Sequence, residues 1–136
     1  MRISGNTFCS IAVAVVLSGA CGDGLSAPLG AERFDPPAVY AVLWGEVETC
    51  AGLQGSMSVV HWYVVPKTLT FPCEYGACRG LWVAPHSIYL SDAAAHDTFF
   101  DEFFTVKHEI LHDLVGAPGH PPVFQQCGLL RDEAPG

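Results

Sequence analysis

Apolar side chains near the start of the chain recur with the spacing of a helix. They stand at Val39, Val42, Leu43, Val47 and Cys50. Residues three and four apart lie on one face of an α-helix, so this spacing predicts a helix that buries one side. Gly52 and Gly55 follow the last apolar position and indicate where the helix ends. We therefore expect a first helix over residues 38–51.

The next apolar runs have the composition of strands. Residues 58–65 are rich in β-branched and aromatic side chains and stop at Pro66, which predicts a strand. Residues 69–71 favour a second, shorter strand. Residues 80–84 and 87–90 flank a Pro-His pair and are typical of the two arms of a hairpin. Three or four short strands are therefore expected after the first helix.

Helical spacing returns between residues 98 and 115. Two adjacent apolar stripes are formed by Phe99, Phe103, Val106, Ile110 and Leu114, and by Phe100, Phe104, Leu111 and Val115. Thr98 and Asp101 resemble a capping box at the start, while Gly116 and Pro118 indicate the end. The order helix, strands, helix predicts an α+β domain with a small, mostly antiparallel sheet of three or four strands.

The first twenty residues have the pattern of an export signal. Arg2 precedes an apolar run over residues 11–17 that is too short to cross a bilayer. The residues that follow resemble the cleavage box of bacterial lipoproteins, in which Cys21 would be lipidated. An ordinary secretory signal cut near Ala20 is the alternative. In either case we expect an exported protein.

The remaining chain divides into a tether and one domain. Residues 21–37 are rich in Gly and Pro and predict a tether from a lipid anchor to a domain at residues 38–136. Such a protein would be anchored at a membrane and would face the periplasm or the cell surface. The full chain has a net charge of −8, and removal of residues 1–20 takes away one basic residue and leaves −9. This charge argues against nucleic acid as a partner, because nucleic-acid binding needs clustered Lys and Arg.

Four cysteines lie beyond Cys21, and an even number in a small exported domain indicates two disulfides. Three connectivities are possible. Cys73 and Cys78 bracket four residues, which is short enough to join a local turn, so that Cys50 pairs with Cys127 by elimination. A cysteine-based metal site is the alternative, although the chain has no Cys-x-x-Cys pair.

Residues 108–112, His-Glu-Ile-Leu-His, carry the clearest chemical signal. His108 and His112 are four apart on a predicted helix, so both imidazoles face the same way and can bind one metal ion. Glu109 lies on the adjacent helical face, where it can reach a water bound to that ion. Metal, water and a carboxylate base are the minimum equipment of a zinc peptidase.

This motif resembles that of the zincin metallopeptidases. In metzincins a glycine and a third histidine stand three and six residues after the second motif histidine, but here Gly116 is four and His120 is eight residues after His112, and no methionine follows. Residues 119–124, Gly-His-Pro-Pro-Val-Phe, look more like compact zincins of the SprT type, in which the third ligand opens a short helix as His-x-x-x-Phe. The resemblance implies a zincin-like fold with a short C-terminal helical tail.

The resemblance also implies roles for individual residues. His108, His112 and His120 would be the protein ligands of Zn²⁺, with water in the fourth position. Glu109 would take the proton of that water and pass it to the leaving amine.

Carboxylates also bind zinc, so Asp113, Asp101 and Glu102 are alternatives to His120 as third ligand. Asp113 could instead support His112 from outside the ligand set or face solvent.

Several other side chains are weaker candidates. His86 is expected in a turn and could stabilise an oxyanion, as could one of three tyrosines at Tyr63, Tyr75 and Tyr89. His61 is expected to be an ordinary sheet residue. By resemblance, the strand at residues 88–90 would bind an extended substrate through backbone hydrogen bonds.

Two functions follow from these residues. The first is a zinc-dependent metallopeptidase that acts on peptide or protein substrates outside the cytoplasm. The second is a non-catalytic envelope lipoprotein with a structural or vestigial metal site. A closed site with four protein ligands is typical of structural zinc, whereas an open position beside Glu109 is typical of catalysis.

Overall fold

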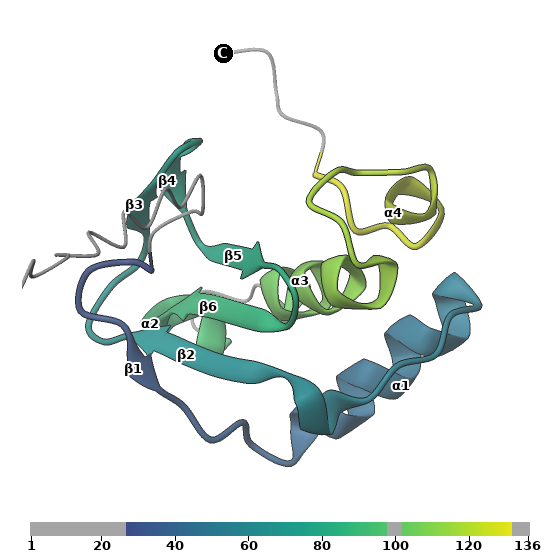
Figure 1. Cartoon of the computed structure of the whole chain (residues 1–136), viewed down its shortest axis with the longest axis horizontal. Helices are drawn as coiled ribbons and strands as arrows, with labels where there is room; N and C mark the ends of the chain where they lie inside the picture. The colour runs from purple at the N-terminus through teal and green to yellow at the C-terminus, as the bar shows by residue number, and fades with distance from the viewer. Residues whose placement is uncertain (1–26, 98–101, 132–136) are drawn as a thin grey trace, which may run out of the picture.

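A four-stranded sheet carries two helices, α1 (Val39–Ala51) and α3 (Phe104–Val115), on one face (Figure 1). The computed structural model describes residues 27–97 and 102–131, and within them the protein has the predicted α+β class. The strands of the sheet are β1 (Glu32–Arg33), β2 (His61–Val65), β5 (Gly80–Val83) and β6 (Ser87–Ser91). The smaller elements are a hairpin of β3 (Phe71–Cys73) and β4 (Gly76–Cys78), helices α2 (Asp92–Ala95) and α4 (Val123–Gln126), and a 3₁₀ turn at Met57–Val59.

The sheet has the spatial order β1-β2-β6-β5. The outer pairs β1–β2 and β5–β6 are antiparallel, as predicted, but the central strands β2 and β6 are parallel. Parallel neighbours need a crossover connection, and here the chain between them forms the β3–β4 hairpin and β5. As a result β5 is an edge strand of the sheet and lies next to α3.

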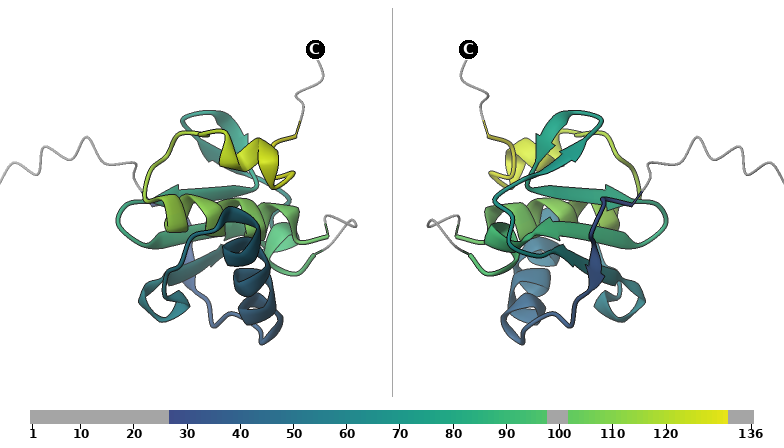
Figure 2. Two further views of the ribbon diagram at one scale, coloured as in Figure 1. Left: turned by 90° about the vertical axis from the view of Figure 1, so that its right-hand side faces the viewer. Right: turned by 90° about the vertical axis from the view of Figure 1, so that its left-hand side faces the viewer.

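The core depends on the alternation of side chains along the strands. Trp62 of β2 and Ile88 of β6 point toward α1 and α3, and the fully buried Tyr40 and Ile110 meet them from the two helices. The intervening residues face the other side, where they pack with the β3–β4 hairpin around Phe71. The opposite views in Figure 2 show α1 and α4 on one side of the sheet.

The start of α3 differs from the prediction. The helix begins at Phe104, because Glu102 and Phe103 have the left-handed φ values of 52° and 54° and cannot continue a right-handed helix. The Phe103 N–H donates to the Asp97 carboxylate at 2.9 Å, and the Phe103 ring packs against Tyr40. Tertiary contacts therefore set this boundary. The expected cap at Thr98 and Asp101 lies outside the described residues.

Two other boundaries also differ. Residues 57–59 form the 3₁₀ turn instead of extending the strand, so that β2 begins at His61. Residues 32–34, which the sequence placed in the tether, contribute β1 and the side chain of Phe34, which packs against the core. The folded region therefore extends further toward the N-terminus than residue 38.

Two disulfides join distant and local parts of the chain. Cys73–Cys78 closes the β3–β4 hairpin, and Cys50–Cys127 joins the end of α1 to the residue after α4. Disulfides persist in oxidising compartments, which is consistent with an extracytoplasmic protein. In the described ranges no helix has the length and hydropathy needed to span a bilayer. The export signal and Cys21 lie outside these ranges.

Gly116 ends α3 in a left-handed conformation with φ 74°, and its N–H donates to the His112 carbonyl at 2.8 Å. Gly116→Ala should lower the free energy of unfolding by about 1 kcal/mol, because an L side chain is strained at this φ. Urea denaturation followed by tryptophan fluorescence measures the change. Gly119→Ala is the matched control, since Gly119 lacks a positive φ and a Cβ there meets no atom within 4 Å. Equal stability of the two variants would contradict this explanation.

Candidate metal centre

The end of α3 brings three histidines together. His108 and His112 are one turn apart on the helix, and the chain reverses after Gly116 so that His120 returns to the same point. The Nε2 atom of His108 lies 3.2 Å from Nε2 of His112 and 3.1 Å from Nε2 of His120. Two nitrogens that bind one tetrahedral zinc at 2.0–2.1 Å are about 3.3 Å apart, so these spacings fit a shared ion.

Hydrogen bonds fix which ring nitrogen of two of these histidines is free. Nδ1 of His108 donates to the carbonyl of Leu129 at 2.6 Å, and Nδ1 of His112 donates to the carbonyl of Ala117 at 2.9 Å. A carbonyl can only accept, so in each neutral ring the proton is on Nδ1 and the lone pair is on Nε2. Lone pairs that face each other at 3.2 Å repel unless a cation lies between them. Backbone carbonyls that hold Nδ1 in this way are the usual support of metal-binding histidines.

Phe124 is the common packing partner of the three rings. It is fully buried in α4, and its ring centroid lies 5.1 Å from that of His108, 4.6 Å from that of His112 and 4.8 Å from that of His120. Packing against one rigid aromatic ring limits the rotamers of all three imidazoles. The Phe of the predicted His-x-x-x-Phe pattern therefore positions the whole group, His120 included.

Burial also favours the neutral state of the helix histidines. It lowers the pKa of His112 to about 4 and lowers the pKa of His108, although the hydrogen bonds to Ala117 and Leu129 oppose this. Both rings are therefore neutral near pH 7, which is the form of imidazole that binds metals.

Glu109 lies between α3 and β5. Burial raises the pKa of Glu109 to about 8, against a hydrogen bond from the backbone N–H of Trp82 that lowers it. The close approach of β5 depends on Gly80. A Cβ at position 80 would lie 2.6 Å from Oε1 of Glu109 and 2.7 Å from Cγ2 of Thr105. Gly80 was not recognised in the sequence, although an isolated glycine in a strand often marks such a close approach.

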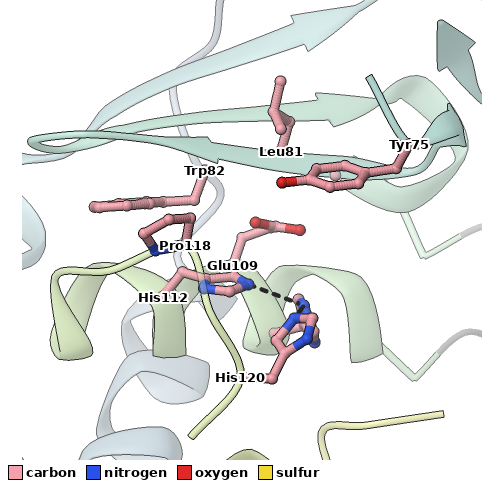
Figure 3. A pocket seen from close by; sticks show the side chains of 9 residues that line it. Tyr75, Leu81, Trp82, Glu109, His112, Pro118 and His120 are labelled. Atoms are coloured by element: carbon pink, nitrogen blue, oxygen red, sulfur yellow. Dashed lines mark hydrogen bonds between the residues drawn. The ribbon is translucent and has the colours of Figure 1, made fainter. Parts of the chain in front are cut away.

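A cavity of about 390 Å³ opens over the histidines and Glu109 (Figure 3). Its lining residues are Tyr75, Gly80, Leu81, Trp82, His108, Glu109, His112, Pro118 and His120. Figure 3 shows Trp82 beside Pro118 on one side of the carboxylate and Tyr75 on the other. This size is within the range of small-molecule and substrate sites.

The two alternative carboxylate ligands within the described residues, Asp113 and Glu102, do not take part in the group. Asp113 is buried and accepts hydrogen bonds from Nε1 of Trp82 at 2.9 Å and from Nδ1 of His86 at 3.1 Å. Glu102 is exposed before α3, and Asp101 lies outside the described residues. Within residues 27–97 and 102–131, the three histidines are the group of potential metal ligands that meets at one point.

The structure also separates the candidates for oxyanion stabilisation. His86 is a turn residue bonded to Asp113 and does not line the cavity. Tyr63 and Tyr89 stack on each other, with ring centroids 4.6 Å apart, on the face of the sheet away from the helices. Tyr75, exposed at the tip of the β3–β4 hairpin, is the tyrosine that borders the cavity.

The strand predicted to bind an extended substrate is a central strand of the sheet. Residues 88–90 belong to β6, which pairs with β2 on one side and β5 on the other, so its backbone groups are occupied. The edge strand beside the cavity is β5. His61, as expected, is an exposed sheet residue, and it contacts Arg33. Comparison with protein-family models, curated proteins and solved structures finds no match for this chain.

Replacement of His120 tests the three-histidine site. The purified protein should bind one divalent transition-metal ion, and His120→Ala should weaken binding by more than the roughly 10–100-fold typical of outer-shell substitutions. Competition with a chromogenic chelator measures the affinity. His96→Ala is the control, because exposed His96 bonds to Asp92 on α2, away from the cavity. Equal affinities of the two variants would exclude His120 as a ligand.

Gly80→Ala tests the packing of β5 on Glu109. The added methyl should force apart β5 and α3 and lower the free energy of unfolding by about 1–3 kcal/mol, as overpacking does. Gly45→Ala in α1 is the control, since a Cβ there meets nothing within 4 Å and alanine favours the helix. The free energy of unfolding of both variants is measured by urea denaturation. An unchanged value for Gly80→Ala would show that β5 and α3 are not tightly packed at Gly80.

Proposed function

We propose that this protein is a zinc-dependent metallopeptidase with a compact zincin-like domain. The observation that carries the proposal is the convergence of three Nε2 atoms beside the buried Glu109 in an open cavity. Three histidines with space for a fourth, non-protein ligand form a donor set typical of catalytic zinc, whereas structural zinc sites are closed by four protein ligands. The His-Glu-x-x-His motif and the His-x-x-x-Phe tail support the same family.

Zinc fits the donor set for chemical reasons. Neutral imidazole nitrogens suit zinc, and the Nε2 spacings of 3.1 and 3.2 Å suit tetrahedral geometry. A zinc ion held there would supply Lewis-acid activation of water and of the scissile carbonyl.

Glu109 is placed to act as the general base. Its carboxylate lines the cavity next to the three imidazoles, and the backbone N–H of Trp82 orients it. It would accept a proton from the attacking water and deliver that proton to the leaving amine. The raised pKa of Glu109 describes the site without an ion, and a nearby cation favours the charged carboxylate.

The edge of β5 supplies a surface for an extended peptide. Ser91 N–H donates to the Arg79 carbonyl at 2.8 Å, which fixes the alternation of the β5–β6 ladder. It follows that Gly80 and Trp82 direct their backbone N–H and C=O groups away from β6, toward the cavity. Because the Trp82 N–H is bonded to Glu109, we propose that the substrate backbone pairs with this edge through Gly80 and the Trp82 carbonyl, while Tyr75 donates a hydrogen bond to the developing oxyanion.

The cellular location completes the proposal. The two disulfides are typical of proteins in oxidising compartments, which supports an extracytoplasmic location. We propose that it is exported by its N-terminal signal and anchored through a lipid on Cys21, so that the peptidase faces the periplasm or the cell surface.

Hydrolysis of fluorogenic peptides tests the activity. The zinc-loaded protein should cleave a mixed peptide library, lose activity on chelation and regain it with added zinc. Glu109→Gln should lower kcat by about 10²–10⁴-fold, the usual contribution of general acid–base catalysis, without loss of zinc. Glu46→Gln is the control, because Glu46 is an exposed residue of α1.

Activity that survives Glu109→Gln would refute the proposed mechanism. Zinc binding without cleavage of any peptide would favour the alternative, a non-catalytic lipoprotein with a structural or vestigial metal site.

A further inference from the structure

The C-terminal segment, residues 117–131, supplies three parts of the metal centre. It contributes the His120 imidazole, the Ala117 carbonyl that accepts from His112, and the Leu129 carbonyl that accepts from His108. Without this segment α3 would present two histidines with no fixed tautomer. The strength of the metal site therefore depends on how firmly the segment is held against α3.

Little secondary structure holds this segment in place. Its helix α4 has four residues, too few to be stable without tertiary contacts. Phe124 and Leu129 are buried, and between them Cys127 forms the disulfide to Cys50 at the end of α1. Cys127 is two residues before Leu129, so the covalent link lies next to the carbonyl that holds His108. Cys50 is exposed and Cys127 is half-buried, so the link lies near the surface of the protein.

We propose that the Cys50–Cys127 disulfide is a positioning element of the metal centre and makes metal affinity depend on the oxidation state of the chain. In the oxidised protein the disulfide holds residues 117–131 near the bound geometry, and less conformational entropy is lost when the ion binds. When a dithiol reduces it, two cysteine thiols and an oxidised dithiol form, and His120 and the Leu129 carbonyl lose this restraint. The inference rests on the metal site of the proposed function and does not require peptidase activity.

The two disulfides of the chain provide a matched comparison. The double variant Cys50→Ser/Cys127→Ser should bind zinc about 10–100-fold more weakly than the wild type, as expected when the support of ligands is lost. The double variant Cys73→Ser/Cys78→Ser should keep the wild-type affinity, because that hairpin borders the cavity but supplies no ligand or ligand partner. Chelator competition gives the affinities, and the visible spectrum of the cobalt form reports the loss of a nitrogen ligand.

Three outcomes of the affinity measurements distinguish whether the inference, the proposed function or both fail. Weaker binding by the first variant alone, with a changed cobalt spectrum, supports the inference. Equal zinc affinity of the first variant and the wild type overturns it while leaving the proposed function intact. A wild-type protein that binds no zinc overturns both.

The wild-type chain provides a second test that does not depend on a variant folding. Coupling between binding events is reciprocal, so bound zinc must stabilise the Cys50–Cys127 disulfide by the same factor by which the disulfide tightens zinc binding. In a glutathione buffer with fixed free zinc, alkylation and mass spectrometry should show zinc shifting the equilibrium of this disulfide toward the oxidised form by about tenfold or more. The Cys73–Cys78 equilibrium should not change. A shift toward the reduced form would show that the freed thiols bind zinc, and it would overturn the inference.

Discussion

In the candidate metal centre, Nε2 of His108 lies 3.2 Å from Nε2 of His112 and 3.1 Å from Nε2 of His120, and the lone pairs of His108 and His112 face each other. This arrangement is unfavourable by itself, because acceptors repel, and it becomes favourable around a cation. Several features of the fold are needed to bring the three histidines together. The chain must end α3 one turn after His112, return with His120, and bring the Ala117 and Leu129 carbonyls to the outer nitrogens of the two helix histidines. The Phe124 ring packs against all three imidazoles.

The position of Glu109 depends on a second constraint, the close packing of β5 on α3. Gly80 permits this packing, and the backbone of Trp82 reaches the carboxylate. One turn further along the same face of α3, Asp113 accepts from the Trp82 indole and from His86, so that the strand is held at two points along the helix. An edge strand, a base and three potential ligands therefore share one cavity, which is the arrangement that the proposed peptide hydrolysis needs.

The sequence predicted much of this structure where the signal is local. The periodicity of α1 and the glycine stop of α3 were correct, and so was the α+β class. The start of α3 was wrong, because Phe103 leaves the helical conformation to pack against Tyr40. The parallel pairing of β2 with β6 was also missed, since strand composition carries no information on the direction of a distant partner. For the same reason the sequence did not show that β6 is a central strand and β5 an edge strand.

The sequence by itself determined the chemistry of the candidate site. Two histidines and a glutamate at fixed spacing on a helix share neighbouring faces in any fold, because helical geometry is set by the backbone. Tertiary structure decided what lies around them: the Leu129 carbonyl on His108, Gly80 beneath Glu109, and Tyr75 instead of Tyr63 or Tyr89 at the cavity. These contacts join residues far apart in the chain, and their formation depends on the packing of the whole core, which no local pattern encodes.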